Sequence, residues 1–148
     1  MRLTWIALVF VALVLGSVSP SYAQAAADKP TKTFEGDAAV AFVYVKAEKT
    51  ADFEELMAKF KEALGKSEAA EVKQQAAGLK VFKAPNGPAP AGSALYVMIA
   101  DPVVKNVEYW FLSILYKAFP ADAQALYQKW QDCKATTGPV FFDLTTIK

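Results

Sequence analysis

The stretch Ala94–Pro120, ALYVMIADPVVKNVEYWFLSILYKAFP, carries the strongest structural pattern in the chain. It begins as a strand of large apolar residues, turns at Asp101–Pro102, and continues as a segment that predicts an aromatic helix from Val107 to Phe119. Apolar residues recur on two sides of this helix, so we expect it to lie between the sheet and another helix, a second subunit or a ligand. One side carries Val107, Phe111, Ile114, Leu115 and Ala118, and the other carries Tyr109, Leu112, Tyr116 and Phe119.

Residues 1–23 have the pattern of a cleaved signal peptide. Arg2 supplies a positive charge, Leu3–Leu15 is apolar, and small residues precede a cleavage point after Ala23, with Ala25 as the alternative. The apolar run is shorter than the roughly 20 residues that a membrane-spanning helix requires. The pattern therefore predicts an exported protein, periplasmic or secreted, that keeps no membrane anchor after cleavage.

Removal of this segment leaves 125 of the 148 residues, enough for one domain with a core of its own. Residues 24–37 lack periodicity and predict a flexible N-terminal lead, and residues 38–148 predict a single α+β domain. The mature chain holds 15 Lys and 15 acidic residues, because Arg2 is the only Arg. A net charge near zero argues against nucleic acid and anionic membranes as partners.

The chain contains no His, which excludes an imidazole base, a His triad, and His ligands to haem or metal. The sequence also contains no phosphate-binding loop and no nucleophile motif, so we assign no catalytic residue, no metal site and no cofactor. Cys133 is the only Cys, and its simplest role is that of a small buried apolar residue. An intermolecular disulfide or a reactive thiol is the alternative.

Hydrophobic periodicity orders the remaining elements as strand, helix pair, strand, strand, helix pair, strand. This is the βαββαβ pattern of the ferredoxin-like fold, in which helices cover one face of an antiparallel sheet. The predicted strands are 38–46, 79–83, 94–100 and 140–147, and the predicted helices are 50–65, 67–77, 107–119 and one that begins at Pro120.

The predicted strands are apolar on both faces, so the sheet face without helices is expected to be buried against a second copy. With the element order and the Gln75–Leu79 entry into the second strand, the chain resembles the dimeric α+β barrel superfamily. That group includes antibiotic-biosynthesis-type monooxygenases and stress-responsive barrel proteins, and the chain is also similar to exported bacterial proteins of this shape. The resemblance implies a homodimer with paired sheets and a small-molecule pocket between sheet and helices.

Aromatic side chains with polar tips suit an apolar or aromatic ligand. A non-catalytic homodimer that binds such a molecule is the first functional expectation. A cofactor-independent, oxygenase-like enzyme acting on an aromatic substrate is the alternative, with an inward-facing Asp143 as a base. A structural or interaction protein without a pocket is the third. The candidate ligand-binding residues are Tyr44, Tyr96, Tyr109, Trp110, Tyr116 and Asp143.

Overall fold

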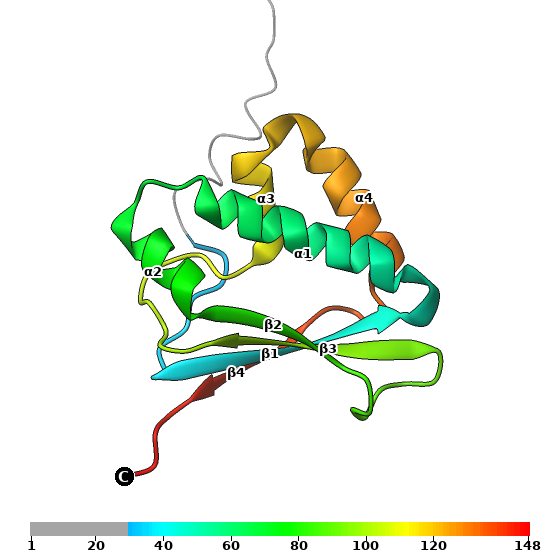
Figure 1. The fold of residues 1–148 in the computed structure, drawn as a ribbon, viewed down its shortest axis with the longest axis horizontal. Coiled ribbons are helices and arrows are strands. Elements are labelled where there is room, and N and C mark those ends of the chain that lie inside the picture. Colours follow the sequence, from blue (N-terminus) through cyan, green and yellow to red (C-terminus); the bar gives the residue numbers. More distant parts are fainter. Residues whose placement is uncertain (1–29) are drawn as a thin grey trace, which may run out of the picture.

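Four antiparallel strands form an open sheet, and four helices lie together on one of its faces (Figure 1). A computed structural model describes residues 30–148. The predicted signal peptide and its cleavage point lie outside the described residues. The strands are β1 (Ala38–Lys46), β2 (Leu79–Ala84), β3 (Ser93–Ala100) and β4 (Val140–Leu144). The helices are α1 (Thr50–Gly65), α2 (Ala70–Gly78), α3 (Phe111–Ala118) and α4 (Ala123–Cys133), with short 3-10 helices η1 (Ala47–Lys49) and η2 (Pro120–Asp122).

The strand order across the sheet is β2-β3-β1-β4, which is compatible with a ferredoxin-like fold. β1 lies at the centre, where Val43 pairs with Tyr96 of β3 and Ala41 pairs with Phe141 of β4. Because side chains alternate along a strand, these four residues face the helices together. The α+β class and the antiparallel sheet predicted from the sequence are confirmed.

The core fills the space between the sheet and α1, α3 and α4. Phe53 and Phe60 of α1 are fully buried, as the helical spacing of apolar residues predicts. Phe60 meets Phe111 of α3 at a ring distance of 6.3 Å, and Phe111 meets Trp130 of α4 edge-on at 5.1 Å. α2 contributes little to this core, since only Gln75 and Gly78 are buried along it.

The predicted helix from Val107 to Phe119 is wrong at its start, because α3 begins only at Phe111. Asn106 has a left-handed φ of 61°, which a right-handed helix cannot contain. The Tyr109 N–H donates to the Lys32 carbonyl at 2.8 Å, and the Trp110 N–H donates to the Glu108 carboxylate at 2.6 Å. These bonds hold the backbone outside the helix, so Val107, Tyr109 and Trp110 belong to the preceding loop.

Residues 30–37 pack against the domain, which differs from the flexible lead expected over residues 24–37. Phe34 is only 4% exposed and meets the Tyr109 ring edge-on at 4.9 Å. The Thr31 and Lys32 N–H groups donate to the Glu108 carboxylate. These contacts join residues more than 70 positions apart, so the local periodicity of the sequence could not predict them.

The other boundaries agree closely with the sequence prediction. β1 and α1 have the predicted bounds, and the Pro- and Gly-rich segment 85–92 connects β2 to β3 as a long hairpin loop. β4 ends at Leu144, three residues before the predicted end at Ile147. At the start of α1, the Thr50 hydroxyl donates to the Ala47 carbonyl at 3.4 Å and caps no helix N–H. Within residues 30–148, no helix is both long and apolar enough to cross a membrane.

Candidate functional site

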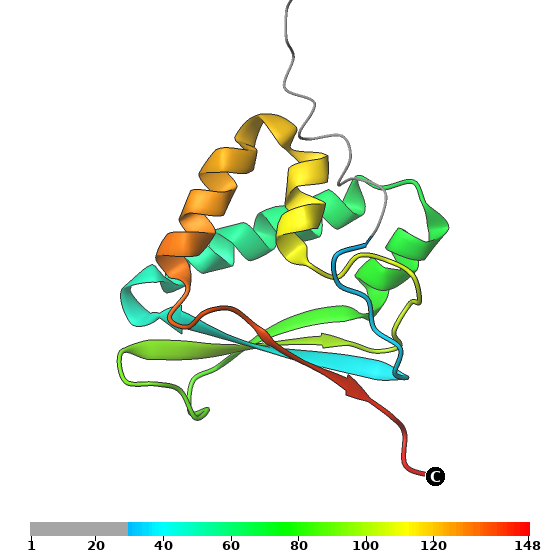
Figure 2. The same ribbon diagram turned by 180° about the vertical axis from the view of Figure 1, so that it is seen from behind.

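The sheet face opposite the helices, here called the outer face, carries no helix (Figure 2). Many of the side chains on it are apolar and partly exposed. The pairing of Phe42 with Val97, and of Val97 with Phe82, places these side chains on that face. Phe82 is 49% exposed and Phe142 of β4 is 47% exposed. The apolar residues of the outer face are Val40, Phe42 and Tyr44 of β1, Phe82 of β2, Leu95, Val97 and Ile99 of β3, and Val140, Phe142 and Leu144 of β4. Lys80 of β2, which pairs with Ile99, lies on the same face at the edge of the sheet.

Within residues 30–148, only the hairpin loop 85–92 approaches the outer face. It bends below the sheet (Figure 1), and a Cβ placed on Gly87 would lie 2.9 Å from the Leu95 side chain. Leu95 is consequently buried at this end of the face. The rest of the face forms a contiguous apolar surface, which monomeric proteins rarely expose.

A groove of about 340 Å³ lies where α1 passes the edge of the sheet. We call it the α1–β2 groove. Met57 of α1 and Val81 of β2 supply apolar walls, and the Tyr96 ring closes the inner side against Phe53 at a ring distance of 4.7 Å. The groove is open to solvent along one side. Its lining residues are Glu54, Met57, Ala58, Lys61, Val81, Phe82, Lys83 and Tyr96.

Three polar groups meet at one end of this groove. The Tyr96 hydroxyl donates to Glu54 Oε1 at 2.6 Å, and Lys83 Nζ donates to the same oxygen at 3.0 Å. These two donors lower the pKa of Glu54. Burial is the first cause that raises the pKa of Tyr96, followed by its bond to Glu54. The cluster therefore holds an ionised carboxylate and a neutral phenol at neutral pH, which favours binding over proton abstraction.

The six candidate residues do not form one site. Tyr44 lies on the outer face, whereas Tyr96 lies on the helix side in the α1–β2 groove. Tyr116 is half-buried on α3, against the main core. Tyr109 and Trp110 both lie in the loop that leads into α3. Of the six, Tyr96 is the residue that lines the α1–β2 groove in the described part of the chain.

Tyr109 and Trp110 serve the packing of that loop. The Tyr109 hydroxyl accepts the Val104 N–H at 2.9 Å, and its ring lies against Phe34. Trp110 meets the rings of Phe111, Trp130 and Phe141 at 5.0, 6.2 and 6.2 Å. The cavity beside Tyr109 and Phe141 measures about 20 Å³, room for about one water molecule.

Asp143 holds the N-terminal segment in place. Its Oδ1 accepts the N–H groups of Glu35 and Gly36, each at 2.9 Å. The bond from Gly36 is the first cause of the lowered pKa of Asp143. A carboxylate stabilised in its ionised form by backbone donors is a poor base, so this geometry gives Asp143 a structural role.

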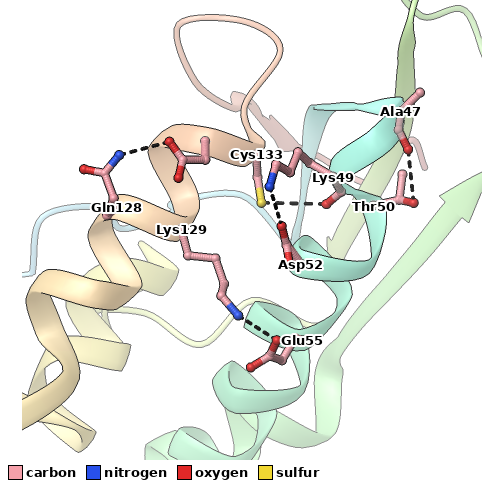
Figure 3. A network of polar contacts seen from close by, with 9 residues as sticks. Ala47, Lys49, Thr50, Asp52, Glu55, Gln128, Lys129 and Cys133 are labelled. Atoms are coloured by element: carbon pink, nitrogen blue, oxygen red, sulfur yellow. Dashed lines mark hydrogen bonds and ion pairs between the residues drawn. The ribbon is translucent and has the colours of Figure 1, made fainter.

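Cys133 lies where the end of α4 meets the start of α1 (Figure 3). Its thiol is fully buried and donates to the Lys49 carbonyl at 3.7 Å. Burial is the first cause that raises its pKa to about 11. Ion pairs between Lys49 and Asp52 and between Lys129 and Glu55 surround it, which agrees with a packing role.

Sequence reasoning missed Glu54, Met57 and Lys83 as groove residues. The spacing of Met57 on α1 indicates core packing, and Lys83 has the appearance of an ordinary charged residue on an edge strand. Glu54 and Lys83 are 29 positions apart, and only the register of β2 against β3 brings both to Tyr96. Within residues 30–148, no group of three or more His, Cys, Asp or Glu side chains is placed to hold a metal ion.

Comparison with family models, curated proteins and solved structures found no match to this chain. Assignment of a function therefore depends on the outer face and the α1–β2 groove.

Proposed function

We propose that the mature protein is a non-catalytic homodimer of ferredoxin-like protomers whose outer faces pack together as a dimeric α+β barrel. The observation that carries this proposal is the apolar outer face, which no helix covers within residues 30–148 and which the hairpin loop 85–92 reaches only at the Leu95 end. A twofold axis would place the same surface on both sides of the interface, and an apolar face is self-complementary. The strand order β2-β3-β1-β4 supports the ferredoxin-like part of the proposal.

The chemistry of the outer face suits a permanent interface. The face carries three aromatic rings beside Tyr44, and Phe42 and Phe142 already contact one another at 5.8 Å. Phe82 and Phe142 are half-exposed, which leaves about 100 Å² of each ring uncovered, since a Phe side chain carries roughly 200 Å². Aromatic and aliphatic cores of this kind distinguish obligate interfaces from ordinary protein surface.

We further propose that the α1–β2 groove binds a small apolar or aromatic group. Its volume of about 340 Å³ lies near the lower end for ligand sites, and its walls combine apolar side chains with the Tyr96 hydroxyl. Burial of about 100 Å² of ligand contributes only ~2.5 kcal/mol before association costs, so a free small molecule binds with micromolar affinity at best.

Export to the periplasm or the medium completes the proposal. It rests on the signal-peptide pattern of residues 1–23, with cleavage after Ala23 or Ala25. N-terminal sequencing of the protein from its native host is expected to begin at Gln24 or Ala26. Intact Met1 on the folded protein would refute export.

Two measurements on residues 24–148 test the rest. Sedimentation equilibrium is expected to give the dimer mass at micromolar concentration, and a monomer there would refute the homodimer.

The groove can be tested through its methionine. Met57 and Met98 are the only methionines of the mature chain, and only Met57 lines the groove. Naphthol is expected to shift the methyl NMR signal of Met57 and leave that of Met98 unchanged.

A variant that fills the groove separates specific from incidental binding. Ala58 is exposed on α1 and lines the groove, so Ala58→Leu adds volume there without disturbing the core. Naphthol is expected to lose its effect on Met57 in this variant. An unchanged response would place the probe elsewhere and refute the groove as the binding site.

A further inference from the structure

One edge of the sheet is open beside the α1–β2 groove. β2 pairs only with β3, so its other edge has no partner strand among residues 30–148. The Asp101 N–H donates to the Gly78 carbonyl at 3.1 Å, which makes Gly78 and Asp101 a hydrogen-bonded pair at the start of the β2–β3 ladder. Such pairs alternate along an antiparallel ladder. The backbone N–H and C=O groups of Leu79, Val81 and Lys83 therefore point away from β3, toward the open edge.

The same three residues project their side chains toward the helices, because they pair with Ala100, Met98 and Tyr96 of β3. Val81 and Lys83 thus present both a groove wall and a free backbone edge. A small molecule in the groove would use the wall only. An extended peptide would use both, since its backbone can pair with β2 while one of its side chains enters the groove.

We propose that the α1–β2 groove and the open edge of β2 together bind an extended peptide, which adds as an antiparallel fifth strand. This inference rests on the proposed role of the groove as an apolar binding site, and it names the ligand class. A peptide residue opposite Val81 forms a hydrogen-bonded pair with it and points its side chain to the same side of the sheet. An apolar or aromatic residue at that position occupies the groove beside Met57 and Tyr96.

The charges around the edge indicate an acidic peptide. Lys61 lines the groove and Lys80 lies next to Val81 on β2, and neither forms an ion pair within residues 30–148. Lys83, by contrast, forms an ion pair with Glu54, with 3.0 Å between Nζ and Oε1. Side chains that flank the groove residue of the peptide point to the other face, where Lys80 lies. The peptide residue that follows the groove residue lies opposite Lys80, so an acidic side chain at that position complements this edge, whereas the residue before it lies opposite Phe82.

The probe is the capped pentapeptide acetyl-Thr-Glu-Phe-Glu-Thr-amide, titrated against residues 24–148 with the Met57 methyl signal as readout. In the antiparallel arrangement the Phe N–H of the peptide donates to the Val81 carbonyl, whereas the Glu N–H groups point to solvent. N-methylation of the Phe nitrogen is expected to weaken binding at least about tenfold, because it removes a hydrogen bond and adds a clash at the strand edge. N-methylation of the second Glu nitrogen is the matched control and is expected to change affinity little.

Substitutions in the protein test the same contact from the other side. Val81→Pro removes an outward N–H and no bond to β3, so the edge strand tolerates it, and it is expected to abolish peptide binding. Val81→Ala keeps the N–H and loses only methyl groups, so it is expected to bind more tightly than Val81→Pro. Should Val81→Pro fail to fold, the pair of N-methylated peptides still decides the question with the unmodified protein.

Naphthol separates this inference from the proposed function. Naphthol binding by the unmodified protein, with affinity lost for the peptide N-methylated at Phe but not for the one N-methylated at Glu, supports strand addition. Naphthol binding without peptide binding, or equal affinity for both N-methylated peptides, refutes strand addition and leaves the groove intact. No response of Met57 to either probe refutes both. A further outcome is that the wild type assembles beyond the dimer, that Val81→Pro abolishes this assembly, and that no peptide binds. The edge of β2 would then pair with another copy of the chain, which would also overturn the proposal.

Discussion

Replacement of Phe142 by Ala tests the outer face as a dimer interface. Phe142 is 47% exposed, and its ring meets that of Phe42 on the same face at a distance of 5.8 Å. About 100 Å² of its surface is free in each protomer, or about 200 Å² in a symmetric dimer. At ~25 cal/mol per Å², burial of this area contributes up to about 5 kcal/mol to association. Since Ala retains part of the contact, we expect a loss of about 3 to 4 kcal/mol.

Such a loss raises the Kd of the dimer by about two to three orders of magnitude. Sedimentation equilibrium over a concentration series measures this change directly. Tyr127→Ala is the matched control, because Tyr127 is 43% exposed but lies on α4 in the helix layer, away from the outer face. Circular dichroism at a concentration where both variants are monomeric checks that each is folded.

The two variants give opposite expectations. Phe142→Ala is expected to dissociate at concentrations where Tyr127→Ala remains dimeric. Equal dimer stability of the two variants would refute the assignment of the interface to the outer face, whatever the oligomeric state of the wild type.

Three further predictions concern stability and the buried thiol. A Cβ on Gly36 would lie 2.5 Å from the Leu144 carbonyl oxygen, so Gly36→Ala is expected to lower the free energy of unfolding by about 1 to 3 kcal/mol, whereas Gly138→Ala, with no atom within 4 Å, changes it little. The pKa of Asp143 is lowered in the folded protein, so its stabilising effect is present above its ordinary value of 3.8 and is lost as pH falls through the lower, folded pKa. Chemical denaturation is therefore expected to show Asp143→Asn less stable than wild type at pH 7, with the difference disappearing in strong acid; a difference independent of pH would contradict this. The pKa of Cys133 is about 11, so a thiol reagent at pH 8 is expected to label it slowly until denaturant unfolds the chain, and rapid labelling of the native protein would contradict its burial.

Local periodicity in the sequence determined much of the fold. A run that is apolar on both faces over 38–46 and helical spacing over 50–65 predicted β1 and α1 with their observed bounds, because each pattern extends over the whole element. Apolar residues on both sides of the predicted strands indicated a sheet that needs cover on both faces. The absence of His and the single Arg2 excluded whole classes of chemistry without any coordinates.

Only the tertiary structure decided the start of α3. The segment 107–110 has helical spacing, but the Lys32 carbonyl bonds Tyr109 and the Glu108 carboxylate bonds the N–H groups of Thr31, Lys32 and Trp110. Hydrogen bonds to Thr31 and Lys32, more than 70 positions away, and the local bond from Trp110 to Glu108 replaced those of the helix. Helical propensity is a weak preference that such tertiary bonds override.

The candidate site also depended on the tertiary structure. Pairing of Val43 with Tyr96 turns Tyr96 toward the helices. There the Tyr96 hydroxyl donates to Glu54 Oε1 of α1, and Lys83 Nζ of β2 donates to the same oxygen. A shift of one residue in that register would move Tyr96 to the outer face and abolish the groove cluster. The sequence supplied the aromatic and charged side chains, but strand register, which depends on contacts between distant segments, determined which of them meet.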